Sequence, residues 1–321
     1  MKRLNTTSIV ALVAAASLAA GLTACSSPTQ ETADNTATTS VRLAATSPMS
    51  WPQAYVATGN DAWSDAGIAL EQTEFATGRE ALQALLGGGA DIAEVSASNV
   101  VGAVYAGNDV VVLGRGGSWG SWNVLVGSDS GIEDAADLVG KRVGVTVGTS
   151  SQLSFDSYLT SQGVDPASVE HVNVAPSDMV SALSSGTVDA VNPWQPVLAR
   201  TIEQLGDSVT ALPYTYEQNY LLATTPEYVK ANPEIVSTFL ATYKSADADL
   251  TSDPATAAGA VSEAAQIDAD MLVSVWRDYT FATGPADQRV VDEMTKVATM
   301  MTDNGDVTGD MPDFAALFYS W

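Results

Sequence analysis

The fold of this chain can be predicted from one stretch, residues 80–93 with the sequence EALQALLGGGADIA. The pattern recurs 98 positions later in residues 178–191, DMVSALSSGTVDAV. Each copy has the apolar spacing of an amphipathic helix, a glycine that can end the helix, and a short apolar strand directly after it. A helix followed by a strand is half of a strand-helix-strand unit, so the repeat predicts two similar lobes.

Strands and helices alternate on both sides of the repeat. We expect crossing strands at residues 123–126 and 220–224, and mostly helices after them. The fold class is therefore α/β, with two lobes that are each a mostly parallel sheet flanked by helices. Residues 41–125 and 218–321 are expected to form lobe one, and residues 126–217 lobe two. The other strands are expected at residues 41–45, 68–75, 90–95, 110–113, 142–147, 172–174 and 189–191.

The N-terminus has the features of a bacterial lipoprotein signal. Lys2 and Arg3 precede an apolar run at residues 9–20, and Leu22-Thr23-Ala24-Cys25 follows. We expect residues 1–24 to be removed and Cys25 to carry a lipid that anchors the protein to the cell membrane on its extracytoplasmic side. A cleavable signal with an incidental cysteine is the alternative. Residues 25–40, rich in Ser and Thr, are expected to be a flexible tether.

Composition excludes several classes of function. The chain has 38 Asp and Glu against 13 Lys and Arg, and its formal net charge of −25 repels nucleic acid. Cys25 is the only cysteine and His171 the only histidine, which leaves no Cys/His zinc site and no Ser-His or Cys-His nucleophile. We expect no cofactor, no metal and no enzyme activity, and we expect His171 to be a surface or edge residue.

Polar and aromatic side chains follow the two repeated strands. Ligands collect beyond the carboxyl ends of parallel strands, and these positions hold Glu94 and Ser96 in one copy and Asn192 and Trp194 in the other. We expect them to face each other across a cleft. The Trp194 ring would pack on the apolar part of a ligand or stack on a cation, and Gln195 would add a hydrogen bond.

Two turns are candidates for anion binding. Thr149, Ser150 and Ser151 open a predicted helix, so they offer hydroxyls, free backbone N–H groups and the positive end of the helix dipole. Ser47 and Ser50 form the matching turn in lobe one. Plain helix caps, without a ligand role, are the alternative for both turns.

Charged and aromatic residues near the cleft suggest the kind of ligand. A carboxylate at Glu94 would pair with an ammonium or a protonated ring nitrogen, which favours a zwitterion or an aminopyrimidine over a simple anion. A structural ion pair of Glu94 with Arg79 or Arg115 is equally compatible, and Arg79 would then serve either a ligand or Glu94. Trp119 is expected in the cleft wall and Trp122 in hinge packing.

Several segments in order resemble one family, the aliphatic-sulfonate, taurine and nitrate-type substrate-binding proteins of ABC importers, which also include thiamine-precursor binders. The resemblance implies a type II periplasmic-binding-protein fold with residues 148–151 at the ligand headgroup. It is carried by residues 128–138, 140–145 (GKRVGV), 148–151 (GTSS), 182–196 and 232–236 (NPEIV).

The function that this resemblance implies is capture of a small ligand. A monomeric receptor would close two lobes over the ligand and deliver it to an ABC permease and its ATPase. Enzymes with a similar architecture need cysteine or histidine chemistry that this chain lacks. A sensor lipoprotein that binds without transport is the remaining alternative. The ligand is left open among sulfonates, taurine-like zwitterions, nitrate, thiamine precursors and aromatic carboxylates.

Overall fold

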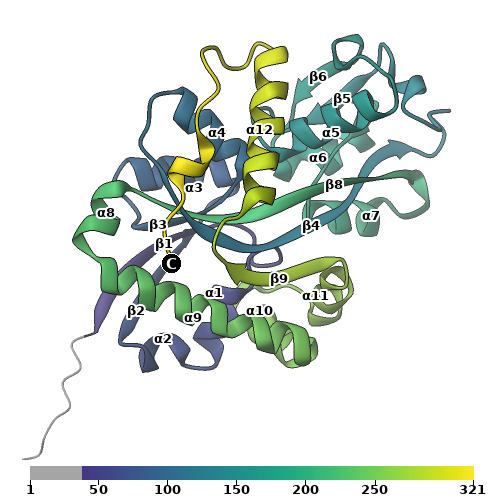
Figure 1. The fold of residues 1–321 in the computed structure, drawn as a ribbon. Helices are drawn as coiled ribbons and strands as arrows, with labels where there is room; N and C mark the ends of the chain where they lie inside the picture. Colours follow the sequence, from purple (N-terminus) through teal and green to yellow (C-terminus); the bar gives the residue numbers. More distant parts are fainter. Residues whose placement is uncertain (1–37) are drawn as a thin grey trace, which may run out of the picture. The chain divides into compact units, whose positions relative to one another are not determined.

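Nine strands form one mixed sheet in residues 38–321, the part of the chain that the computed structural model describes (Figure 1). The strand order is β2-β1-β3-β8-β4-β7-β5-β6, and β9 pairs with β4. The strands are β1 (Thr39–Ala45), β2 (Ile68–Glu74), β3 (Ile92–Ser96), β4 (Val111–Gly127), β5 (Arg142–Val145), β6 (Glu170–Asn173), β7 (Ala190–Val191), β8 (Val209–Thr224) and β9 (Tyr279–Gly284).

Two groups of parallel strands lie at the ends of this sheet. β1 pairs in parallel with β2 and β3, and β5 pairs in parallel with β6 and β7. We call these groups, with the helices that cover them, the first and second lobe. The antiparallel strands β8 and β4 lie between the groups and belong to both. The predicted α/β fold with mostly parallel lobes is confirmed.

Helices cover the sheet, and one of them contacts both lobes. α12 packs against α4 of the first lobe and α5 of the second (Figure 1). The helices are α1 (Gln53–Gly59), α2 (Ala62–Asp65), α3 (Gly78–Leu86), α4 (Ala97–Tyr105), α5 (Ser150–Ser161), α6 (Met179–Ser184), α7 (Val197–Leu205), α8 (Pro226–Ala231), α9 (Pro233–Ser252), α10 (Pro254–Ala265), α11 (Ala269–Trp276) and α12 (Gln288–Asp303).

The sequence repeat corresponds to α3 with β3 and α6 with β7, and the structure shows why it contains Asp. Asp91 Oδ2 accepts the backbone N–H of Arg42 at 2.8 Å, and Asp91 Oδ1 pairs with the Arg42 guanidinium at 2.6 Å. Asp189 makes the same contacts with Arg142, at 2.9 and 2.8 Å. Each Arg–Asp pair joins the repeated strand to its parallel neighbour. The equivalent strand pairing is therefore supported by the same contact in both lobes.

The repeat also needs its glycines. Gly88 and Gly186 have positive φ angles of 75° and 70°, in the left-handed region that favours glycine. Their carbonyls accept from the guanidinium groups of Arg42 and Arg142 at 2.9 and 2.8 Å. The turn between helix and strand is thereby tied to the same arginine that holds the aspartate.

The crossing strands are longer than the sequence predicts. Residues 111–113 and 123–126 are parts of one strand, β4, and residues 220–224 are the end of β8. The expected lobe boundaries at 125/126 and 217/218 fall inside these strands and stay predictions. The register of β4 against β8 shifts between Trp119 and Ser121, so the ladder is irregular midway along both strands.

The C-terminal part is mostly helical, as expected, although the strand β9 lies between α11 and α12. Other sequence-based assignments need correction. The helix expected from Trp51 with a Ser50 cap starts at Gln53 instead. Pro52 is the residue directly before the helix, where the fixed φ angle of proline is favourable. Residues 39 and 40 belong to β1 rather than to the tether. The predictions for residues 1–37, including the signal and the lipid at Cys25, lie outside the described residues.

Candidate ligand-binding site

A cleft lies at the carboxyl ends of the parallel strands, between the two lobes. Its wall is formed by the turn after β1, the starts of α3, α4 and α5, the crossing strands and the loop after β7. In this structure the free space inside the cleft is about 40 Å³, which is room for a few water molecules. Seven of the twelve predicted ligand residues line it, namely Ser47, Ser50, Ser96, Trp119, Thr149, Ser150 and Trp194.

Three donors in the cleft wall have no hydrogen-bond partner among the described residues. They are Thr46 Oγ1, Ser47 Oγ and Trp51 Nε1, and all three atoms are shielded from solvent. An unpaired buried donor costs about 1–3 kcal/mol, and such groups in native proteins call for an explanation. Three of them in one wall fit a ligand that carries several acceptor oxygens.

Three helices begin at the cleft. The hydroxyl of Thr77 caps α3 by accepting from Glu80 N at 3.2 Å, and α4 starts directly after Ser96. Thr149 caps α5 by accepting from Ser151 N at 3.2 Å, which confirms the predicted start of this helix. Helix N-termini carry a partial positive charge. The backbone dipoles of helices from both lobes therefore make a positive contribution to the potential in the cleft.

Charged side chains are absent from the cleft wall in the described part of the chain. Arg79 lies outside the wall, where its Nη1 donates to the Val147 carbonyl at 3.5 Å and its guanidinium packs against Gly148 of the other lobe. Hydroxyls, amides and helix ends, rather than a lysine or arginine, are thus the groups that can recognise an oxyanion here.

Aromatic rings form much of the remaining wall. Trp51 packs on Tyr220 with ring centroids 4.4 Å apart. Tyr220 and Trp119 both stack on Tyr279, at centroid distances of 5.6 and 5.8 Å. Half-buried Trp194 lines the cleft from the second lobe. These rings suit the apolar body of a ligand, because aromatic faces offer a large contact area with few rotatable bonds.

Glu94 lies behind the cleft wall. Its side chain is fully buried, with Oε2 accepting the Thr46 N–H at 2.9 Å and Oε1 accepting the Tyr243 hydroxyl at 3.2 Å. No cation of the described chain pairs with it, so the alternative of an ion pair with Arg79 or Arg115 is wrong. Burial raises the pKa of Glu94 to about 8. This placement does not support the expectation that Glu94 faces a cationic ligand group.

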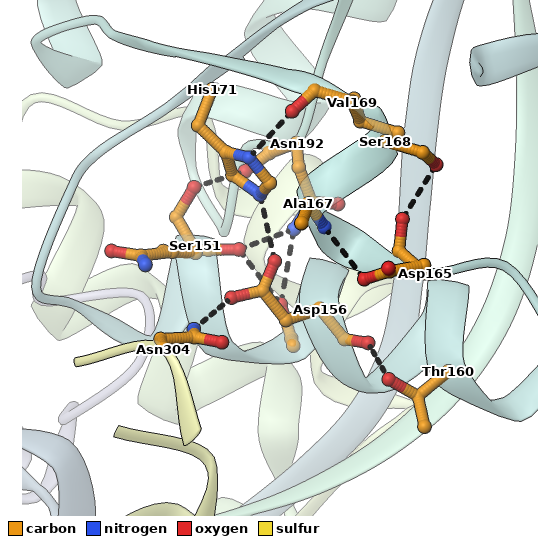
Figure 2. Close-up of polar contacts among 12 residues, drawn as sticks. Ser151, Asp156, Thr160, Asp165, Ala167, Ser168, Val169, His171, Asn192 and Asn304 are labelled. Carbon is orange, nitrogen blue, oxygen red and sulfur yellow. Dashed lines mark hydrogen bonds and ion pairs between the residues drawn. The ribbon is translucent and has the colours of Figure 1, made fainter. Parts of the chain in front are cut away.

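Ser151 and Asn192 hydrogen-bond each other at the start of α5 (Figure 2). Ser151 Oγ donates to the Asn192 carbonyl at 2.6 Å, and Asn192 Nδ2 donates to the Ser151 carbonyl at 2.8 Å. The Tyr214 hydroxyl donates to Asn192 Oδ1 at 2.9 Å. Gln195 Oε1 accepts from Ala199 N at 3.2 Å in α7. These three predicted ligand residues therefore do not line the cleft, because their polar groups hold helix starts in place.

His171 lies on the edge strand β6, as expected, but it has a partner. Figure 2 shows its Nε2 beside Asp156 Oδ1, at 2.7 Å, and Asn304 Nδ2 donating to Asp156 Oδ2 at 2.8 Å. Asn304 follows the last residue of α12 and Asp156 belongs to α5, so this contact joins the two helices. Burial is the largest single effect and opposes the charged imidazole. The hydrogen bond and charge of Asp156, the Val169 carbonyl and the charge of Asp306 together outweigh it, so the pKa of His171 is raised.

We expect His171→Gln to destabilise the protein more at pH 6 than at pH 9. A pKa raised in the folded state gives stability that is complete below about pH 6.5 and is lost as pH rises through the folded value. The melting temperature should fall by roughly 2 °C or more at pH 6 and by less at pH 9, as followed by circular dichroism. Equal losses at the two pH values would contradict a charged pair with Asp156.

Sequence reasoning missed part of the cleft. Thr46, Trp51, Gln218 and Tyr220 also line it. Thr46 follows directly on an apolar strand and precedes Ser47, which is the signal that could have identified it. Trp51 could not be told from a core tryptophan, because its side chain is largely buried and the sequence does not show that its indole N–H lacks a partner.

No group of three or more His, Cys, Asp or Glu side chains in the described part of the chain could hold a metal ion. Within residues 38–321, no helix has both the length and the apolar character that crossing a membrane requires.

Two lobes joined by crossing strands, with a small-molecule cleft at the strand ends, define a periplasmic-binding-protein fold. The periplasmic aliphatic sulphonate binding protein SsuA from Escherichia coli has this fold, with a TM-score of 0.76 and 21% identity over 87% of this chain and 97% of that one. The alkanesulfonate-binding protein SsuA from Xanthomonas axonopodis pv. citri, bound to MOPS, has the same fold with a TM-score of 0.72. It is 19% identical, and the match covers 84% of this chain and 94% of that one.

The chain belongs to the NMT1/THI5-like family, whose profile matches residues 52–257. A Bacillus subtilis (strain 168) protein whose name carries the words "aliphatic sulfonates-binding protein" is 24% identical over 240 residues, 74% of this chain and 71% of its own length. The taurine-binding periplasmic protein of Escherichia coli (strain K12) is 24% identical over 178 residues, 54% and 55% of the two chains. These relatives are substrate-binding proteins and not enzymes, in agreement with the expectation for this chain.

Proposed function

We propose that the chain is the extracytoplasmic receptor of an ABC importer and captures a small ligand with a sulfonate-type oxyanion and an apolar body. The unpartnered donors Thr46 Oγ1, Ser47 Oγ and Trp51 Nε1 carry this proposal. A sulfonate is ionised at neutral pH and carries no proton. Its three oxygens accept hydrogen bonds from different directions. Donors from a turn, an indole and helix starts can meet such a group together.

The aromatic wall supports an apolar body on the ligand. Trp51, Trp119, Trp194 and Tyr220 leave space beside the donors and offer ring faces to it. An acidic partner for a ligand ammonium is absent from the wall in the described residues, so a plain alkanesulfonate or arylsulfonate fits better than a taurine-like zwitterion. The names of the sulfonate-binding relatives agree with this choice.

Closure of the lobes is the proposed mechanism. Ser47 and Trp51 come from the first lobe, whereas Thr149, Ser150 and Trp194 come from the second. A ligand that contacts both sets stabilises the closed state, and only this difference in affinity can shift the equilibrium that a permease and its ATPase would sense. The receptor would act as a monomer, held at the cell membrane by a lipid on Cys25.

A binding screen of the unlipidated mature protein tests the proposal. Thermal shift and tryptophan fluorescence would be measured with 1-butanesulfonate, taurine, nitrate, an aminopyrimidine and benzoate. A ligand at a hundredfold excess over Kd adds about 2.7 kcal/mol of stability, so we expect 1-butanesulfonate to raise the melting temperature clearly. A response to the aminopyrimidine or to nitrate, with none to any sulfonate, would overturn the proposed ligand class.

Trp194→Ala should weaken binding of 1-butanesulfonate by about 1–3 kcal/mol, because the variant loses the ring that the second lobe presents to the cleft. Isothermal titration calorimetry would measure the change. Trp63→Phe is the matched control, since Trp63 packs on Phe239 in the core away from the cleft. An unchanged affinity in Trp194→Ala would remove this residue from the site.

A further inference from the structure

Glu94 is a buried acid that supports the cleft without lining it. It is the middle residue of β3, none of its surface is exposed, and its Oε2 accepts the backbone N–H of Thr46 at 2.9 Å. Thr46 and Ser47 form the turn whose hydroxyls are unpartnered in the cleft. The Glu94 carboxyl therefore holds, from behind, the same turn whose front would receive the ligand.

The surroundings of Glu94 contain no positive side chain among the described residues that could offset a buried carboxylate. Glu74 of β2 and Tyr55 of α1 face it, and the Tyr55 hydroxyl donates to Glu74. From α9 it meets the Tyr243 hydroxyl, 3.2 Å from Oε1, with Asp247 one turn further along the helix. Every facing group is neutral or acidic, so the uncharged carboxylic acid is the form that this site favours.

The second copy of the repeat shows what this position requires. Asn192 occupies the place that corresponds to Glu94, 98 positions later. Its Nδ2 donates to the Ser151 carbonyl at 2.8 Å and so fixes the turn that opens α5 on the other side of the cleft. A neutral side chain that hydrogen-bonds the neighbouring turn is sufficient in the second lobe, and a protonated Glu94 would be its counterpart in the first.

We propose that Glu94 is a positioning residue that acts as the neutral acid, fixing the Thr46–Ser47 turn and keeping negative charge away from a bound oxyanion. The inference rests on the proposed function and adds a coupling between ligand binding and proton uptake. An anion in the cleft disfavours the carboxylate form of Glu94 behind it, so binding at alkaline pH takes up a proton from solvent. Affinity should be constant at pH 6–7 and fall as pH rises through about 8, at most about tenfold per pH unit.

Calorimetric titration with 1-butanesulfonate at pH 6.5–9 tests the linkage, because this probe has no group that titrates in the range. Buffers of different ionisation enthalpy would report the proton uptake. In the wild type we expect Kd to rise about five- to tenfold between pH 7 and pH 9. Glu94→Gln should bind as tightly as wild type at pH 6.5 and show no pH dependence, since its amide oxygen can still accept the Thr46 N–H. Glu94→Ala should bind more weakly at every pH.

Two results would overturn the inference. One is a wild-type Kd that does not change from pH 6.5 to 9, without proton uptake. The other is a Glu94→Gln affinity more than about fivefold weaker than wild type at pH 6.5, which would mean that the carboxylate itself is required.

Nuclear magnetic resonance of the ligand-free protein separates this inference from the proposed function. The Thr46 amide signal should titrate with a midpoint near pH 8 in the wild type and should not titrate in Glu94→Gln. Failure of 1-butanesulfonate to bind would refute the proposed function while this titration still decides the state of Glu94. A Glu94 carboxyl that is already ionised at pH 6.5 would refute the positioning role as the neutral acid.

Discussion

Trp122→Ala is expected to lower the free energy of unfolding by about 3–5 kcal/mol, the range for removal of a large buried aromatic ring. Trp122 has no solvent exposure and lies in β4, the strand that passes from one lobe to the other. Its ring packs 4.8 Å from Trp119, and its Nε1 donates to the Tyr216 carbonyl at 3.0 Å. The substitution would leave both a cavity and an unsatisfied acceptor in the crossing strands.

Urea unfolding followed by circular dichroism measures this loss. Trp321→Ala is the comparison variant, because Trp321 is 45% exposed, so its removal costs less burial even though its Nε1 donates to the Leu113 carbonyl of β4. We expect the control to cost much less than Trp122→Ala. Equal costs for the two variants would show that the packing between the crossing strands contributes little to stability.

The double variant Thr46→Val/Ser47→Ala should weaken binding of 1-butanesulfonate by about 3 kcal/mol, roughly 150-fold in Kd, because it removes two hydrogen bonds to a charged group. In the ligand-free protein both hydroxyls lack partners among the described residues. Removing unpaired buried donors relieves a desolvation cost, so the free energy of unfolding should stay unchanged or rise. Opposite changes in affinity and stability are the signature of groups kept for a ligand.

Calorimetry and urea unfolding of the same preparation would give both quantities. Thr73→Val, at an exposed position on β2, is the matched control and should change neither. A double variant that loses stability along with affinity would mean that the two hydroxyls hold the turn itself. A double variant with wild-type affinity would place the oxyanion elsewhere in the cleft.

Much of the fold was predictable because its signals are local. The periodicity of residues 80–93 and 178–191 is a property of adjacent residues, and α3 with β3 and α6 with β7 follow it. The hydroxyl of Thr149 caps α5 through a contact with a residue two positions away, so this cap does not depend on distant parts of the chain. The strand β9 was not predicted, because it becomes a strand by pairing with β4 more than 150 residues away.

The candidate site divides in the same way. The position of Ser47, Thr149, Ser150 and Trp194 at strand and helix ends could be predicted, since in this fold such ends meet at one edge of the sheet. Which polar side chains face the cleft could not be predicted from the sequence. Ser151 and Asn192 are both buried, where water cannot satisfy their polar groups. They therefore hydrogen-bond each other, each as donor and as acceptor.

The sequence by itself determined the fold class, the two related lobes and the helix starts that meet at the cleft, because apolar periodicity and capping act over a few residues. Tertiary structure alone decided the role of Glu94. Its partner Tyr243 is 149 positions away, and its burial comes from strands and helices of several segments. Burial and pairing govern whether a carboxyl carries charge, and both depend on contacts between segments that are distant in the chain.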